Sequence, residues 1–157
     1  MKRTVFLGTY TKGESKGIYS CRFDDETGAL SGFRLAAETP SPSFLALHPS
    51  GKFLYAVNET DDYEGTTSGS VTAYRIISAE GGVLEKLNTV SSHGAHPCHL
   101  ILTPRADAVI IANYTGSTVA AIEIRNDGSL GKTLNRILHK GSGALKPRQA
   151  EPHPHAV

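Results

Sequence analysis

A repeated stretch decides the fold of this chain. The sequence PSFLALHP at residues 42–49 returns 55 residues later as PCHLILTP at residues 97–104. The same offset relates residues 53–58 to residues 108–113, and each of these short apolar runs ends in asparagine. Short runs rich in Val, Ile, Leu, Tyr and Phe that are separated by Gly, Pro, Asp or Asn are typical of β-strands. The repeat therefore predicts an all-β protein.

Twelve such runs occur along the chain, and no stretch has the 3.6-residue apolar period of a helix. The expected strands are 3–9, 17–23, 33–38, 43–48, 53–58, 70–76, 85–91, 98–103, 108–113, 118–124, 134–139 and 153–157. Each full repeat holds four of them, and a four-stranded repeat of about 40–50 residues is typical of a β-propeller blade. One such sheet cannot bury both faces alone, so successive blades stack face to face.

The repeat also divides the chain into blades of antiparallel strands. We expect a partial first blade at residues 1–40, full blades at 41–95 and 96–150, and the start of a fourth blade at 151–157. A closed ring needs at least about four blades. The sequence is therefore interpreted as the N-terminal part of one longer propeller domain, in which the remaining blades complete the ring. A deliberately short repeat protein is the alternative.

Composition excludes several classes of protein. The 157 residues include 16 Lys and Arg against 15 Asp and Glu, so a net charge of +1 predicts neither a nucleic-acid partner nor an anionic membrane surface. No apolar run is long enough for a membrane span, and residues 1–8 lack the apolar core of a signal peptide. Cys21 and Cys98 are too few for a disulfide framework, so both are expected to be reduced, buried thiols. We predict a cytoplasmic location.

Polar residues end the repeated apolar runs. Asn58-Glu59 and Asn113-Tyr114 occupy equivalent positions, and Thr9-Tyr10 ends the matching run of the first blade. Similar polar groups would then meet at one mouth of the propeller, where ligands usually bind. Asn58, Glu59, Asn113 and Tyr114 are therefore predicted to contact a polar substrate. The alternative is that they satisfy backbone groups in turns.

Histidines form a second group of candidates. His96 and His99 flank the start of the third blade, and His153 and His155 lie one repeat later, with Arg148 and Gln149 just upstream; His93 lies nearby. A planar guanidinium suits a carboxylate or phosphate. A neutral imidazole can take a proton from water or protonate a leaving oxygen near pH 7. The alternative is that these histidines are structural.

The sequence gives less support to a metal site, to nucleotide binding and to serine-hydrolase chemistry. The spacing His93-x-x-His96-x-x-His99 allows a zinc site, which His153-x-His155 could join. No carboxylate or cysteine pattern beyond Cys98 supports it, and we predict no metal and no cofactor. The chain has no Gly-x-Gly-x-x-Gly, P-loop or Gly-x-Ser-x-Gly motif, which disfavours nucleotide binding and serine-hydrolase chemistry.

Taken in order, these motifs resemble the seven-bladed propeller lactonase family. Its members are described as 6-phosphogluconolactonases or 3-carboxy-cis,cis-muconate lactonizing enzymes. The resemblance covers the whole chain and is carried by residues 6–11, 42–59, 94–99, 112–117 and 148–155. Each motif is weak by itself, and their combined order is specific.

The resemblance implies an active site at the Arg-Gln and Pro-His-x-His motifs. His155 or His153 would be the acid/base group and Arg148 the anion clamp, with further substrate contacts from Gln149, His96 and His99. Water would attack the carbonyl of an anionic sugar lactone, such as 6-phosphogluconolactone. In lactonizing members the same groups would orient a carboxylate and move a proton. A non-catalytic binding propeller is the remaining alternative, although the chain has no Trp and lacks the Trp-Asp signature of common binding propellers.

Overall fold

The structure is a computed structural model that describes residues 1–146 and 148–157. The strands are β1 (Lys2–Leu7), β2 (Gly17–Asp24), β3 (Leu30–Glu38), β4 (Leu45–Leu47), β5 (Phe53–Asn58), β6 (Ser70–Ser78), β7 (Val83–Ser91), β8 (Pro97–Leu102), β9 (Ala108–Asn113), β10 (Thr118–Ile124) and β11 (Leu130–Leu138). They form three antiparallel sheets, ordered β1-β2-β3, β4-β5-β6-β7 and β8-β9-β10-β11. The predicted all-β fold with four-stranded antiparallel blades is confirmed.

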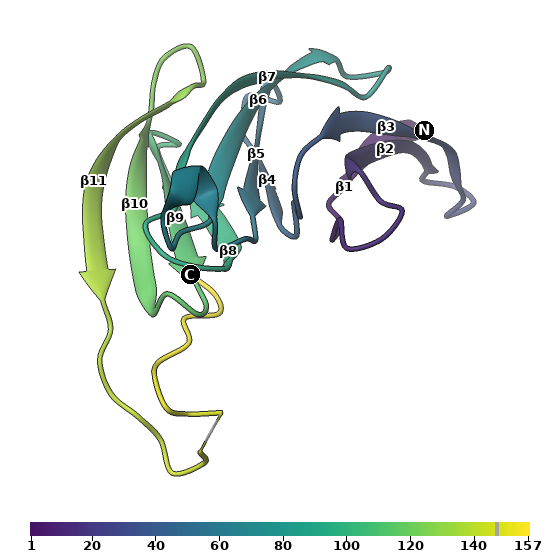
Figure 1. The fold of residues 1–157 in the computed structure, drawn as a ribbon. Coiled ribbons are helices and arrows are strands. Elements are labelled where there is room, and N and C mark those ends of the chain that lie inside the picture. Colours follow the sequence, from purple (N-terminus) through teal and green to yellow (C-terminus); the bar gives the residue numbers. More distant parts are fainter. Residues whose placement is uncertain (147) are drawn as a thin grey trace.

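Each sheet is a meander in which strands that follow one another along the chain also pair. β5 pairs with β6 from Phe53 opposite Arg75 to Asn58 opposite Ser70, and β9 pairs with β10 in the equivalent way up to Asn113 opposite Thr118. Because the registers correspond, the residues that follow β5 and β9 leave their sheets at the same end. The three sheets stand side by side as successive blades (Figure 1).

The core explains why β5 is apolar at consecutive positions. Leu54 and Ala56 belong to the cluster between the first and second sheets, whereas Tyr55 and Val57 belong to the cluster between the second and third. Successive side chains of a strand point to opposite faces, so the middle sheet buries both of its faces. A strand of this kind needs an unbroken apolar run instead of alternation.

Two details differ from the expected elements. Residues 153–157 form no strand, because Pro152 and Pro154 cannot donate to a ladder. The C-terminal segment, residues 152–157, instead makes isolated hydrogen bonds to β8 and to Ser117. A short 3₁₀ helix, η1 (Tyr63–Gly65), also lies in the loop between β5 and β6. Within the described residues no helix is long and apolar enough to cross a membrane.

Candidate active site

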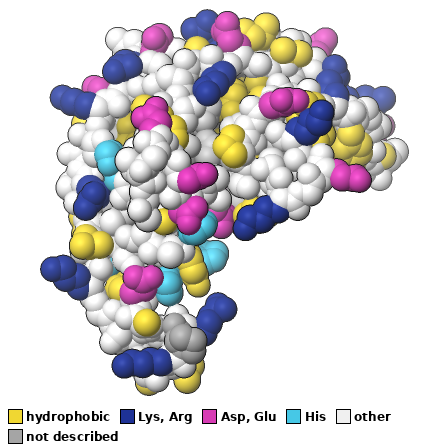
Figure 2. All heavy atoms as spheres, viewed as in Figure 1, with side chains coloured by type: hydrophobic (Ala, Val, Ile, Leu, Met, Phe, Trp, Pro, Cys, Tyr) yellow, Lys and Arg dark blue, Asp and Glu magenta, His cyan; other side chains and the backbone are white. Residues whose placement is uncertain are grey.

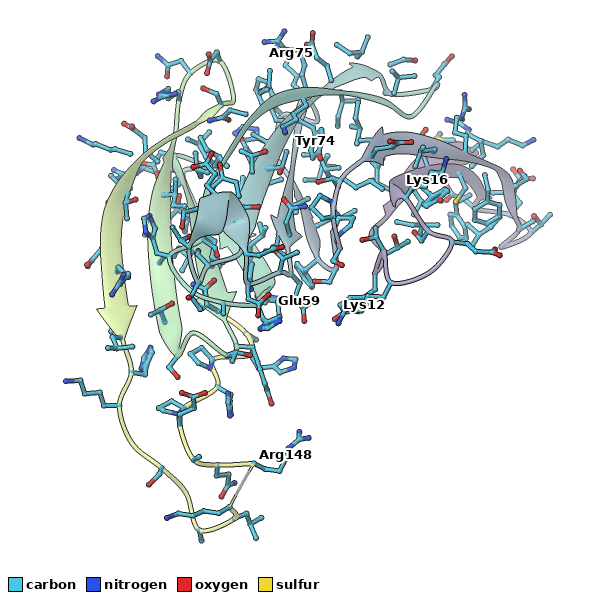
Figure 3. All side chains as sticks on the ribbon, viewed as in Figure 1. Lys12, Lys16, Glu59, Tyr74, Arg75 and Arg148 are labelled. Carbon is cyan, nitrogen blue, oxygen red and sulfur yellow. The ribbon has the colours of Figure 1, made fainter. Side chains whose placement is uncertain are left out.

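The residues that follow β1, β5 and β9 meet at one end of the three sheets. Tyr10, Glu59 and Tyr114 line one pocket of about 210 Å³, and Ser43, Cys98 and His155 complete the lining. The pocket therefore draws on all three sheets and on the C-terminal segment. Figure 3 shows Glu59 at this end, with Lys12 nearby in the view. Histidine side chains gather in the same region, next to acidic ones (Figure 2).

A hydrogen bond joins the first and second sheets at the pocket. The Tyr10 hydroxyl donates to Oε2 of Glu59 over 2.9 Å. This bond, together with partial burial and the negative charge of Glu59, raises the pKa of Tyr10 above its usual value of 10.0. The phenol therefore stays protonated at neutral pH and acts as a permanent donor to the carboxylate.

The C-terminal segment is held against the third sheet by Tyr114 and its neighbours. The His153 ring stacks on the Tyr114 ring at 4.5 Å between centroids, and the His155 ring meets it edge-on at 5.5 Å. Ser117 Oγ donates to the carbonyl of Pro152 over 2.7 Å, which fixes the start of the segment. Both predicted acid/base histidines are thus packed around one aromatic ring, and His155, which is exposed, faces the pocket.

The hydrogen bonds also define which ring nitrogen carries a proton. Nδ1 of His153 lies 3.0 Å from the carbonyl oxygen of Tyr114, and a carbonyl only accepts, so Nδ1 is the donor and Nε2 carries the lone pair of the neutral ring. Nδ1 of His99 accepts from the backbone N–H of Val157 over 3.3 Å, so its proton is on Nε2. His153 and His99 are therefore held in opposite tautomers.

The structure does not bring Asn58 or Asn113 to the pocket. Both are almost fully buried, at 1% and 0% exposure. Asn58 Nδ2 donates to Thr39 Oγ1 and to the carbonyl of Pro40, and Asn113 Nδ2 donates to the carbonyl of Ser92 and to Thr118 Oγ1. These bonds support the backbone just before Glu59 and Tyr114, and direct contact of Asn58 and Asn113 with substrate stays a prediction.

The histidines of the repeated turn point to separate partners. His93 Nε2 is hydrogen-bonded to Thr133 and His96 Nδ1 to Thr115, while the His99 ring packs 4.2 Å from the Phe44 ring. None of the three lines the pocket, although His99 touches the C-terminal segment beside it. Across residues 1–146 and 148–157, no group of three or more His, Cys, Asp or Glu side chains is arranged to hold a metal ion.

Arg148 and Gln149 lie in the loop between β11 and the C-terminal segment. Both are exposed, and the Gln149 side chain accepts a hydrogen bond from the backbone N–H of Leu145 over 3.0 Å. Gln149 borders a separate hollow of about 490 Å³ together with His153. Figure 3 shows Arg148 on this loop, beyond the ends of the strands. The structure therefore does not place the predicted anion clamp on the pocket that holds Glu59 and His155.

Sequence reasoning missed Ser43 and Cys98, which both line the pocket. They occupy the same repeat position, each directly after the proline that opens a repeat, and this shared position was the available signal. Cys98 is half-buried; its burial, and then the charge of Glu59, raise the pKa of its thiol above 9.0. Cys98 is therefore a neutral thiol at physiological pH. Cys21 is also free, and it is buried as expected.

A further hollow of about 330 Å³ lies at the opposite end of the strands. Lys2, Thr4 and Arg22 line it together with residues of β4 and β6. The guanidinium of Arg22 is already hydrogen-bonded to Thr4 and to the carbonyl of Lys2. None of the predicted site residues lies there, so the pocket between Glu59 and His155 is the better candidate site.

Comparison with known proteins agrees with this fold. Residues 4–157 match the family described as "Lactonase, 7-bladed beta-propeller". The chain belongs to this family. Among its relatives, a 6-phosphogluconolactonase of Bacillus subtilis (strain 168) is 36% identical over 150 residues, which are 96% of this chain and 41% of that protein. The chain thus spans about two fifths of the length of the curated relative it matches.

Solved structures of lactonases superpose closely on the chain. A putative 6-phosphogluconolactonase from Bacteroides fragilis NCTC 9343 is 39% identical with a TM-score of 0.86, over 97% of this chain and 40% of that one. The periplasmic gluconolactonase PpgL of Pseudomonas aeruginosa is 32% identical with a TM-score of 0.89, over 100% of this chain and 44% of that one. Because one similar structure is that of a periplasmic enzyme, the cytoplasmic location of this lactonase-family chain stays a prediction.

Proposed function

We propose that the protein is a lactonase that hydrolyses the ring ester of an anionic sugar lactone such as 6-phosphogluconolactone. The observation that carries the proposal is the small pocket that His155, Glu59, Tyr10 and Ser43 line together. The names of the similar proteins from B. subtilis and B. fragilis support the same reaction. The muconate-lactonizing alternative receives no support from them.

The proposed reaction uses His155 as the general base. The neutral imidazole takes a proton from water as its oxygen attacks the lactone carbonyl, and neutral donors in the pocket stabilise the oxyanion that forms. The bond between the carbonyl carbon and the ring oxygen then breaks, and the proton passes from the imidazolium to that oxygen. The product is an open-chain hydroxy acid. His153 is hydrogen-bonded to the Tyr114 carbonyl and stacks on the Tyr114 ring. It thereby holds in place the ring against which His155 packs.

Substitution of His155 in the intact gene product tests the proposal. We expect His155→Ala to lower kcat/KM for 6-phosphogluconolactone by about 100-fold or more, since a positioned general base contributes about 10²–10⁴ in rate. His139→Ala is the matched control, because His139 is an exposed histidine outside the pocket. Rates are measured above uncatalysed hydrolysis, with and without a chelator.

The possible results of this assay distinguish the assigned base, a metal-dependent reaction and a non-catalytic propeller. Equal activity of His155→Ala and His139→Ala would contradict the assignment of the base, and loss of activity with chelator would favour a metal-dependent hydrolase. Arg148→Ala in the same assay tests the anion clamp. Because Arg148 is exposed on a loop outside the pocket, we expect little change in KM or kcat, and a rise in KM with unchanged kcat would support the clamp that the sequence predicts. If the intact gene product hydrolyses no lactone, the alternative of a non-catalytic binding propeller is favoured.

A further inference from the structure

The Glu59 carboxylate is the only acidic group among the lining residues of the pocket. It is half-buried, and across the described residues its side chain has one hydrogen bond, from Tyr10, and no ion pair with a basic side chain. A partly buried carboxylate without a cationic partner is costly unless donors surround it. Tyr10 satisfies Oε2, so Oε1 remains available to a ligand.

Hydrogen bonds fix the backbone that carries this carboxylate. The backbone N–H of Glu59 donates to the carbonyl of Ser41 over 3.0 Å, and the backbone N–H of Ser41 donates to Thr11 Oγ1 over 3.0 Å. Asn58, the preceding residue, is locked inside the second sheet. The bond from Tyr10 therefore links the first and second sheets and holds the Glu59 carboxylate at the lining of the pocket before any ligand arrives.

The groups around Glu59 match a hydroxyl-bearing ring. Ser43 also lines the pocket, and its buried Oγ has no hydrogen-bond partner of good geometry among the described residues. Tyr114 offers an aromatic wall, and Cys98 is a neutral neighbour. A carboxylate accepts hydrogen bonds from hydroxyl groups. This set therefore favours a polyhydroxylated lactone over an unsubstituted one.

We propose that Glu59, positioned by Tyr10, is a specificity-determining residue that accepts hydrogen bonds from the ring hydroxyl groups of the substrate. This inference rests on the proposed lactonase function and adds the means by which the pocket distinguishes hydroxylated lactones. Glu59 takes no part in proton transfer to the reacting ester; it acts only on binding and orientation.

Two lactones distinguish this role from a catalytic one. In the intact gene product we expect Glu59→Gln to lower kcat/KM for glucono-δ-lactone by about 10- to 100-fold, as expected for loss of charge-assisted hydrogen bonds. For δ-valerolactone, which has no hydroxyl groups, kcat/KM should change by less than about twofold. Glu14→Gln, at an exposed glutamate outside the pocket, is the control and should leave both substrates unaffected. Tyr10→Phe should raise KM for glucono-δ-lactone while changing kcat little, because the carboxylate stays but is no longer held.

A binding measurement separates the failure of this inference from the failure of the proposed function. The cyclic polyol 1,5-anhydro-D-glucitol has ring hydroxyls but no ester. In an NMR titration we expect its Kd to be lower for the wild type than for Glu59→Gln, by about 10-fold or more. An equal loss of kcat/KM for both lactones, or equal or absent binding of the polyol by the two proteins, would overturn the specificity role. If no lactone is hydrolysed but the polyol still binds in a Glu59-dependent way, the proposed function fails and the inference on hydroxyl recognition stands.

Discussion

Adjacent residues take opposite roles at the ends of β5 and β9. Asn58 and Asn113 turn inward and bond the backbone of neighbouring turns, whereas Glu59 and Tyr114 turn into the pocket. The sequence marked these positions as candidate site residues, because polar residues end apolar strands there. It could not tell which member of each pair faces the ligand, since an asparagine suits both a buried turn and a binding site.

Tyr55 makes the stability of the protein sensitive to alkaline pH. Its side chain is fully buried, and its hydroxyl donates to the carbonyl of Gly128 over 3.0 Å. Burial, with a smaller effect of Asp127, raises the pKa of Tyr55 to about 12 from 10.0. The folded state therefore keeps the proton over a range in which the unfolded state loses it. The resulting stability is fully present below pH 10 and is lost as pH rises toward 12.

The test compares wild type with Tyr55→Phe in the intact gene product. We expect the wild type to lose roughly 2–3 kcal/mol relative to Tyr55→Phe between pH 9 and pH 12, at about 1.4 kcal/mol per pKa unit. Urea unfolding at several pH values measures this difference, and the titration of lysines cancels between the two proteins. A stability difference that is independent of pH would show that Tyr55 ionises normally.

At the level of elements, the turn between β10 and β11 joins the second sheet to the third. The Asn88 side chain on β7 both donates to the carbonyl of Leu130 and accepts from its backbone N–H, each over 2.9 Å. Gly128 in this turn lies against the ring of Phe53. The hairpin itself was predicted from the repeat, but its attachment to the preceding blade depends on contacts between residues far apart in sequence.

Two turn glycines separate packing from backbone conformation in this element. Gly128 and Gly51 have φ values of +86° and +69°, but a Cβ on Gly128 would lie 2.3 Å from Phe53, whereas a Cβ on Gly51 would meet no atom within 4 Å. We expect Gly51→Ala to cost about 1–2 kcal/mol for the left-handed conformation. Gly128→Ala should cost about 1–3 kcal/mol more from overpacking. Thermal unfolding of the intact gene product measures both, and equal decreases in Tm would contradict the role of the Phe53 contact.

At the scale of the whole molecule, the middle sheet packs against a neighbouring sheet on each face, whereas within the described residues each outer sheet packs on one face alone. Large apolar side chains are exposed on the outer sheets, at Phe33 on β3 with 58% exposure and Ile137 on β11 with 53%. The blade boundaries, and the interpretation of the chain as part of a longer propeller, stay predictions. Uncovered sheet surfaces of this kind promote association between chains.

Residues 1–157 expressed alone should therefore associate and lack lactonase activity. Sedimentation velocity is expected to give species larger than a monomer, and a dye that binds apolar surface should become fluorescent. The intact gene product, measured at the same concentration, is the control. A stable, monomeric and active product of residues 1–157 would contradict this expectation.

Local pattern was sufficient to place eleven of the twelve expected strands, because the spacing of apolar runs and turn residues is a property of neighbouring positions and repeats along the chain. The exception is residues 153–157, where Pro152 and Pro154 prevent a strand. Local pattern was also sufficient to mark the polar strand ends and the Pro-His-x-His segment as candidates. Stacking of the sheets decided the rest: it brought Tyr10, Ser43 and Cys98 beside Glu59 and His155, turned Asn58 and Asn113 inward, and left Arg148 on an exposed loop. Pocket contacts join residues separated by as many as 145 positions, and such contacts depend on how faces pack, which no local periodicity encodes.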